Sequence, residues 1–163
     1  MAQPIITLAP LAEHPDLVSQ VGELRWREWG HDEATPEHWT QITARENESH
    51  RLPMTIVAID ELGKAAGAVA LGESDDALTE GERSGRSPWL LGMVVRSDCR
   101  GLGLGRRLSD ALEDLARSRS YPVVWVATGP DAADFYRRCG WADEQELTLV
   151  KGGWQTFVLS KGL

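Results

Sequence analysis

Glycines at alternating positions form the segment of this sequence best suited to chemistry, RGLGLG at residues 100–105. The segment follows an apolar run, residues 88–95, and precedes apolar residues at helical spacing from Leu104 onward. Backbone N–H groups at the start of a helix lack partners within the helix, and the helix dipole favours an anion there. Glycines let the backbone approach a phosphate closely and adopt positive φ angles. Because Arg106 and Arg107 add positive charge, the segment is suited to binding a diphosphate.

Two common phosphate-binding motifs do not fit these residues. A P-loop needs GxxxxGK[ST], but counting from Gly101 the last three positions are Arg106, Arg107 and Leu108. A dinucleotide-binding fingerprint needs GxGxxG and an acidic residue about 20 positions later. Here Arg106 stands where the third glycine should be, and no acidic residue lies around Tyr121. The glycine segment therefore belongs to a different class of phosphate loop.

The RGLGLG segment matches the pattern [RQ]-x-x-G-x-[GA], which resembles the signature of the GCN5-related N-acetyltransferase (GNAT) family. A second segment, ADFYRRCGW at residues 133–141, resembles another signature of that family, a Phe-Tyr pair followed by a helix-ending glycine and an aromatic residue. The resemblance covers about residues 54–160. The segments SPWLLGMVV and FYRRCGW are particularly similar to a group of small bacterial members with no settled substrate.

The order of the apolar patterns agrees with an α/β (α+β) fold of this family, in a single domain over residues 1–163. The resemblance implies a mixed, mostly antiparallel central sheet of about seven strands. That sheet has a parallel pair at a splayed centre and about four flanking helices. Strands are predicted at residues 5–8, 54–60, 65–72, 88–95, 122–127, 146–150 and 155–159. Helices are predicted at residues 16–29, 35–49, 104–119 and 130–139. Gly92, inside the fourth strand, indicates a bulge or a close backbone approach.

The resemblance also implies the activity, which is acetyl transfer from acetyl-CoA to a primary amine of a small molecule or peptide. The acceptor amine would attack the thioester directly in a ternary complex. The diphosphate of the co-substrate would rest on the glycine segment, and its pantetheine arm would pair with the strand edge before it. The cofactor-binding residues so implied are Met93, Val94, Val95, Arg100, Gly101, Leu102, Gly103, Leu104, Gly105 and Arg106.

Direct attack needs a base for the acceptor ammonium and a proton donor for the leaving thiolate. Tyr136 matches the family's tyrosine in the second role, and the alternative is a core tyrosine with a satisfied hydroxyl. The base is left open, because residues 89–95 contain no carboxylate. Glu73, Glu28, His31, Asp32 and a water chain are the candidates.

The net charge of −8 argues against nucleic acid as a partner. Residues 1–95 contain 16 acidic and 7 basic residues, whereas residues 96–138 contain 6 acidic and 8 basic residues. This distribution is typical of a solvated acidic surface, but it also suits a cationic acceptor beside an anionic co-substrate. The tryptophans Trp26, Trp29 and Trp39 are predicted either to pack in the core or to line the acceptor site.

The cysteines and the lengths of the apolar runs bear on whether the protein binds metal or membranes. Cys99 and Cys139 are too few for a disulfide scaffold and do not have metal-ligand spacing, so we expect packing roles and no metal. No apolar run is long enough to span a membrane, which predicts a cytoplasmic protein that does not bind membranes. A homodimer is compatible with the resemblance. Residues 74–87 are predicted to form a mobile flap over the acceptor side.

A second function class is also compatible with the glycine segment, namely a non-catalytic acyl-CoA-binding domain that regulates a partner protein. Such a domain would keep the glycines and lose the proton donor, and the presence of Tyr136 argues against it. A third class, a binder of amino acids or peptides, would leave the glycine segment unexplained.

Overall fold

The structure is a computed structural model that describes residues 3–30, 34–148 and 155–163. Its strands form one mixed sheet of seven in the order β1-β2-β3-β4-β5-β7-β6, with β4 and β5 parallel, which confirms the predicted fold class. The strands are β1 Thr7–Pro10, β2 Met54–Ile59, β3 Ala65–Gly72, β4 Trp89–Val95, β5 Val123–Thr128, β6 Ala142–Thr148 and β7 Gln155–Gly162. The α-helices are α1 Val18–Trp29, α2 Pro36–Arg45, α3 Glu80–Arg83, α4 Leu104–Ser118 and α5 Pro130–Arg138. Short 3-10 turns occupy Leu11–Glu13, Pro15–Leu17 and Ser97–Cys99.

The chain divides into two compact units. Unit 1 contains residues 1–71 and 92–112, and unit 2 contains residues 72–91 and 113–163. The organisation of the chain as a single domain stays a prediction.

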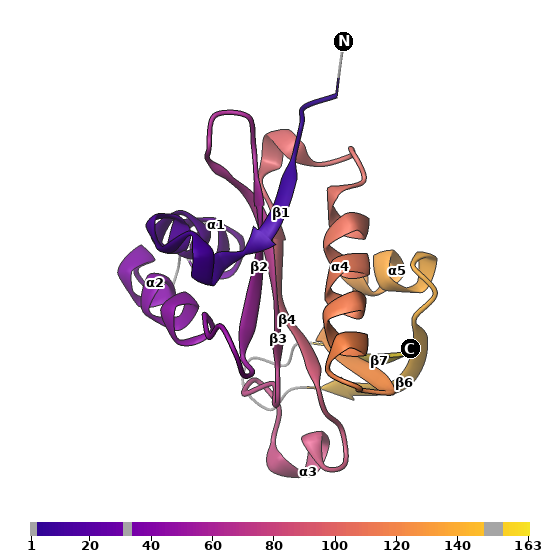
Figure 1. Cartoon of the computed structure of the whole chain (residues 1–163). Helices are drawn as coiled ribbons and strands as arrows, with labels where there is room; N and C mark the ends of the chain where they lie inside the picture. The colour runs from indigo at the N-terminus through magenta and orange to yellow at the C-terminus, as the bar shows by residue number, and fades with distance from the viewer. Residues whose placement is uncertain (1–2, 31–33, 149–154) are drawn as a thin grey trace. The chain divides into compact units, whose positions relative to one another are not determined.

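Unit 1 is built on the antiparallel strands β1, β2 and β3. Helices α1 and α2 lie on one face of these strands, and the first part of α4 lies on the opposite face (Figure 1). The core on the α1 side includes Leu17 and Val21 of the helical segment, Val57 of β2 and Val94 of β4, all buried. This packing of apolar helix positions onto the sheet is the pattern that the helical spacing predicts.

Two boundaries in unit 1 differ from the sequence prediction. The first strand spans Thr7–Pro10 rather than residues 5–8, because its register with β2 pairs Thr7 with Ile59 and Pro10 with Ile56. Proline is tolerated there because β1 is an edge strand. Helix α2 ends at Arg45 rather than at residue 49. The carbonyl oxygen of the next residue, Glu46, accepts a hydrogen bond from Thr55 Oγ1 at 2.7 Å, which directs the chain toward β2.

Strand β4 is less buried than its apolar sequence predicts. Trp89, Leu90 and Val94 are buried, but Leu91, Gly92, Met93 and Val95 are only half-buried. Gly92 has a φ angle of +54°, a backbone conformation that favours glycine. The parallel register of β4 with β5 is a single position, Trp89 opposite Trp125.

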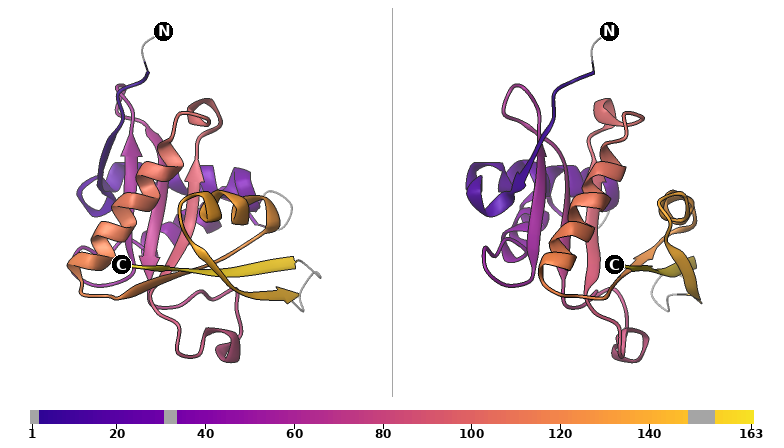
Figure 2. Two further views of the ribbon diagram at one scale, coloured as in Figure 1. Left: turned by 90° about the vertical axis from the view of Figure 1, so that its right-hand side faces the viewer. Right: turned by 45° about the vertical axis from the view of Figure 1, so that its right-hand side comes forward.

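Unit 2 contains the antiparallel ladder of β5, β7 and β6, and Figure 2 shows β6 and β7 lying side by side near α5. Its core joins Leu78, Trp89 and Val158. Strand β6 begins at Ala142, earlier than the predicted residue 146, and it is mostly exposed. The acidic residues of β6 interrupt the apolar pattern from which strands were predicted, although charged side chains are common on edge strands. Residues 149–150 of the predicted strand and the predicted turn at Gly152 and Gly153 lie outside the described residues.

The predicted flap, residues 74–87, is more ordered than a plain loop. It contains the one-turn helix α3, which opens with a capping box between Thr79 and Glu82. After the helix, Arg86 bonds to Gln145 Oε1 at 2.8 Å and lies over the ring of Trp125. These contacts hold the end of the segment within unit 2.

Within the described ranges, none of the helices combines the length and apolar character needed to cross a membrane. The location of the protein in the cell stays a prediction.

Candidate functional site

The glycine segment forms a loop that has the backbone conformation expected of an anion site. Gly101 and Gly103 have φ angles of +75° and +78°, and a Cβ atom at either position would meet no other atom within 4 Å. The backbone N–H of Arg107 donates to the carbonyl of Gly103 at 3.1 Å, so helical bonding begins there. The preceding N–H groups of the first turn, at Leu104, Gly105 and Arg106, have no partner within α4. Open space and free amides therefore occur together at the start of this helix.

Arg96 anchors the chain immediately before this loop. Its backbone N–H donates to Ala66 O at 2.8 Å, and its guanidinium bonds to Ala65 O and to Asp60 Oδ2, each at 2.9 Å. Burial alone would raise the pKa of the Asp60 carboxyl, but hydrogen bonds from the Lys64 N–H and from Arg96 lower it below the usual value. Asp98, which is exposed, completes the group with a contact of 2.6 Å to Arg96 Nε.

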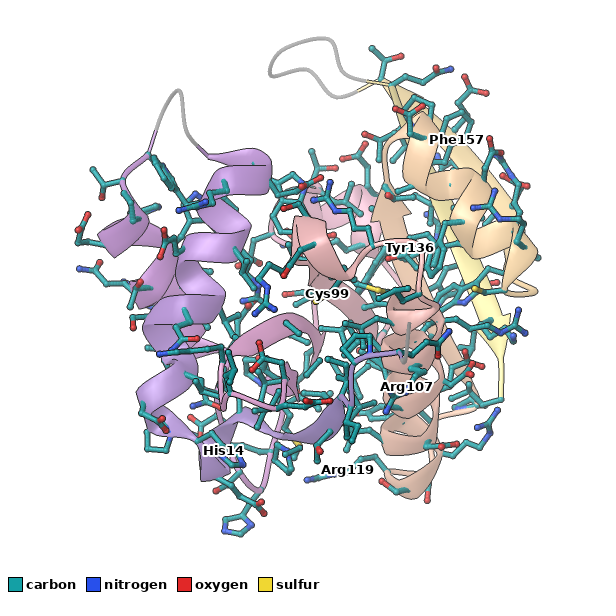
Figure 3. All side chains as sticks on the ribbon, turned by 90° about the horizontal axis from the view of Figure 1, so that it is seen from above. His14, Cys99, Arg107, Arg119, Tyr136 and Phe157 are labelled. Atoms are coloured by element: carbon teal, nitrogen blue, oxygen red, sulfur yellow. The ribbon has the colours of Figure 1, made fainter. Side chains whose placement is uncertain are left out.

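The three arginines of the loop differ in what they contact. Arg100 pairs with Glu28 of α1 at 2.8 Å, and its Nε donates to Val95 O at 3.1 Å. Arg107, labelled in Figure 3, donates to Ile6 O at 2.9 Å. Arg106 is exposed and forms no ion pair with any described residue. Of the three, Arg106 is the side chain most available to an incoming anion.

Tyr136 lies on α5 in unit 2, on the side that packs into the protein (Figure 3). Its ring makes edge contacts with Phe135 and Trp141, with ring centroids 5.1 and 5.4 Å away, and the residue is 5% exposed. Burial raises the pKa of its hydroxyl, and the nearby Cys139 adds to that effect. The Tyr136 hydroxyl is therefore protonated at neutral pH. Its role in proton transfer stays a prediction.

The structure places two of the predicted base candidates. Glu28 is engaged by Arg100 in an ion pair, and Glu73 is exposed immediately after β3. His31 and Asp32 lie outside the described residues. The role of these residues as a base stays a prediction.

The N-terminal tryptophans are neither all core nor all surface. Trp26 is half-buried and donates from Nε1 to Ala34 O at 2.7 Å. Trp29 is 48% exposed and lies against Trp39, with ring centroids 5.9 Å apart. The exposed face of Trp29 is compatible with a lining role, which stays a prediction.

Arg25 is a residue that sequence reasoning missed. It is 1% exposed on α1, and it contacts Glu46, Thr43 and the carbonyl of Gly92. A lone arginine in a helix gives no local signal of burial, and Glu46 and Gly92 lie 21 and 67 residues away in the sequence. The predicted bulge or close backbone approach at Gly92 did not point to the Arg25 side chain.

Cys99 and Cys139 are buried and are not joined in a disulfide, and burial raises the pKa of Cys99. Across residues 3–30, 34–148 and 155–163, no group of three or more His, Cys, Asp or Glu side chains could hold a metal ion.

Comparisons with known proteins agree on one family. The sequence model described as the acetyltransferase (GNAT) family matches residues 18–141. No curated protein matches the chain significantly.

Solved structures resemble the chain along almost its whole length. An aminoglycoside 6′-N-acetyltransferase complexed with coenzyme A superposes with a TM-score of 0.77 at 16% identity, covering 97% of this chain and 96% of that one. An aminoglycoside 6′-acetyltransferase type Ii gives 0.72 at 20% identity, with 97% and 96% covered. A GCN5-related N-acetyltransferase from Rhodopseudomonas palustris gives 0.65 at 19% identity, with 100% and 99% covered. At these identities the likeness shows the fold.

Proposed function

This chain belongs to the acetyltransferase (GNAT) family, and we propose that it moves the acetyl group of acetyl-CoA onto an amine by direct attack in a ternary complex. Membership of this family identifies the chain as an acetyl-CoA-dependent N-acetyltransferase, as the two sequence signatures predict. The identity of the acceptor, the site residues and the order of events are proposals.

One observation carries the assignment of the co-substrate site, namely the glycine loop. Gly101 and Gly103 have positive φ angles with open space in front of them, and the amides of the first α4 turn have no helical partner. These groups fit a diphosphate, because a helix N-terminus favours negative charge and the glycines leave room for it. Arg106 would add a cation, and the strand segment Met93–Val95, in which Met93 and Val95 are half-buried, would offer its edge to the amides of the pantetheine arm.

In the proposed reaction, the acceptor nitrogen attacks the thioester carbonyl carbon, a C–N bond forms and the C–S bond breaks. The ammonium of the acceptor must first lose a proton, and the departing thiolate must gain one. We assign the second transfer to the Tyr136 hydroxyl, since its burial keeps it protonated. A thiol has a pKa of about 8.5, below that of a tyrosine, so the Tyr136 hydroxyl is still protonated when the thiolate leaves and can donate a hydrogen bond or its proton to it.

The acceptor is proposed to be a small amine that carries positive charge. The acidic excess of residues 1–95 supports a cationic ligand, and two structures with the same fold are named for aminoglycosides. A peptide amine is the alternative acceptor. A homodimer remains compatible with the family.

The experiment is an acceptor panel that follows the release of free thiol from acetyl-CoA. The panel includes polyamines, aminoglycosides, amino acids and a lysine peptide, and mass spectrometry identifies the product. We expect thiol release that depends on the acceptor, and a product that is heavier than the acceptor by about 42 mass units, the mass that one acetyl group adds. Tight binding of acetyl-CoA without turnover of any acceptor would favour a non-catalytic acyl-CoA-binding domain.

A further inference from the structure

Arg25 of α1 connects both N-terminal helices to strand β4 within unit 1. Its Nη1 donates to Glu46 Oε1 at 2.8 Å and to Thr43 Oγ1 at 3.1 Å, at the carboxyl end of α2. Its Nε donates to the carbonyl oxygen of Gly92 in β4 at 3.1 Å. The guanidinium therefore fixes one backbone carbonyl of the strand against a helix pair.

Gly92 and the guanidinium fit each other closely. A Cβ atom at Gly92 would lie 2.9 Å from three atoms of the Arg25 guanidinium, which is closer than van der Waals contact. The φ angle of +54° also favours glycine at this position. The strand can therefore turn under the arginine only because residue 92 has no side chain.

This arrangement is expensive for the fold. Complete burial of a cation costs several kcal/mol of desolvation free energy, which one ion pair seldom offsets. Apolar residues could fill the same space without this cost. Burial lowers the pKa of Arg25, while its charge and hydrogen-bond partner Glu46 acts to raise it. In addition, Nη2 is buried without a hydrogen-bond partner among the described residues. Packing alone does not explain why an arginine occupies this position.

The place where Arg25 contacts the strand suggests its purpose. Gly92 immediately precedes Met93–Val95, the edge to which we assign the pantetheine arm of acetyl-CoA. The direction in which those residues present their N–H and C=O groups depends on the backbone angles at Gly92. A shift of the Gly92 carbonyl would rotate the following peptide groups and misalign any strand-like pairing with the co-substrate.

We propose that Arg25 is a positioning residue, which holds the turn at Gly92 so that the edge of Met93–Val95 is aligned for the acyl-pantetheine arm of acetyl-CoA. This inference rests on the proposed function, because it assumes that the arm pairs with that edge. It assigns no contact between Arg25 and the co-substrate, since the arginine acts through Gly92.

The decisive variant is Arg25→Lys. Lysine keeps a positive charge that can pair with Glu46. Its single ammonium group lacks the planar, forked set of donors of a guanidinium, so it cannot also donate to the Gly92 carbonyl in the same geometry. Two ligands separate the effects. Acetyl-CoA needs both the glycine loop and the strand edge, whereas 3′-phospho-ADP (adenosine 3′-phosphate 5′-diphosphate), which lacks pantetheine, needs the loop alone.

We expect Arg25→Lys to weaken acetyl-CoA binding by about 10-fold or more, in line with the loss of a hydrogen bond from a charged donor, and to leave the Kd of 3′-phospho-ADP unchanged in calorimetry. The KM for acetyl-CoA should rise in parallel. Arg27→Lys is the matched control, because Arg27 lies on the same helix with its side chain 69% exposed in a surface pair with Glu23. The control should leave both affinities unchanged.

Other results would overturn the proposal. Wild-type affinity for acetyl-CoA in Arg25→Lys would show that only the buried charge matters, and an equal loss for both ligands would indicate a general structural role. If that variant does not fold, Glu46→Gln keeps an oxygen that can accept from Nη1 and should show the same selective loss to a smaller extent. Failure of the wild-type protein to bind acetyl-CoA at all would instead reject the proposed function.

Discussion

Gly103 is the residue at which the conformation of the glycine loop can be tested most directly. Its φ angle of +78° is rarely adopted by other residues, and it lies one residue before α4. Gly103→Val should reduce acetyl-CoA affinity by more than about 100-fold, because at least two charge-assisted amide contacts would be misdirected. Isothermal titration calorimetry measures this loss.

Gly63 supplies a matched control for that substitution. It has a φ angle of +75° in the turn between β2 and β3 and open space around it, so Gly63→Val imposes the same backbone strain. Both variants should lose about 1–2 kcal/mol of unfolding free energy, but only Gly103→Val should lose affinity. Equal affinities for a folded Gly103→Val and the wild type would remove the loop from the site.

Tyr136 is tested by removing its hydroxyl alone. Tyr136→Phe keeps the ring contacts with Phe135 and Trp141, so the fold and the acetyl-CoA affinity should change little. Loss of a general acid should lower kcat by about 10²–10⁴-fold when the chemical step limits the rate. Tyr121→Phe, at the other tyrosine of the chain, should leave kcat unchanged.

The pH dependence gives an independent check. Because burial raises the pKa of the Tyr136 hydroxyl, this group stays protonated over the whole neutral and mildly alkaline range. The wild-type kcat should therefore show no loss from its ionisation up to about pH 10, the usual value for tyrosine. Wild-type kcat in Tyr136→Phe would return the residue to a packing role.

At the scale of elements, the anchor of Arg96 on the β2–β3 hairpin is testable through Asp60. The pKa of Asp60 is lowered in the folded state, so its contribution is present above the unfolded value of about 3.9 and is lost as the pH falls through the folded value. Asp60→Asn should cost about 1–3 kcal/mol of unfolding free energy at pH 7. The difference from wild type should shrink below about pH 4.

Asp98 provides the comparison for this measurement. It also contacts Arg96, but its side chain is 67% exposed, against 12% for Asp60. Asp98→Asn should therefore cost less than about 1 kcal/mol in urea unfolding, as exposed ion pairs do. A larger loss for Asp98→Asn than for Asp60→Asn would contradict the anchor.

The segment of residues 74–87 is a second element whose behaviour can be predicted. Despite the α3 turn, most of it is exposed, so limited trypsin digestion should cut after Arg83 before it cuts the strands. Thr79→Ala removes the capping box and about 1 kcal/mol of local stability, which should speed this cut about fivefold. Bound acetyl-CoA with an acceptor should slow it. A segment as resistant as the core would disprove the prediction of a flap.

At the scale of the whole molecule, sequence patterns predicted the order of the elements because most strands and helices bury an apolar face. The sequence patterns failed for elements that do not bury an apolar face. Strand β6 starts at Ala142 among acidic residues, and α3 depends on a capping box between Thr79 and Glu82 rather than on apolar spacing. The end of α2 depends on Thr55, which lies in a different element.

The candidate site likewise contains features that the sequence could predict and a feature that it could not. The glycine loop was predictable because its conformation is local, and Gly101 and Gly103 adopt positive φ angles as expected. The contact between Arg25 and Gly92 was not predictable, because it joins residues 67 positions apart and needs a tertiary fold to exist. The sequence indicated that residue 92 of the strand is a special position, but it did not indicate the contact with the Arg25 side chain.

The charge of the whole molecule leads to the last prediction, which concerns the acceptor. Residues 1–95 carry a net charge of −9 within a chain of −8, so a cationic acceptor should be attracted and an anionic one repelled. At low salt, kcat/KM for a diamine should exceed that for an amino acid of similar size by about 10-fold or more, within the range of electrostatic steering. Raising the salt to about 0.5 M should reduce the preference, because screening shortens the Debye length to a few ångströms. A preference that salt leaves unchanged would indicate contacts specific to one acceptor, and faster turnover of anionic acceptors would disprove the cationic assignment.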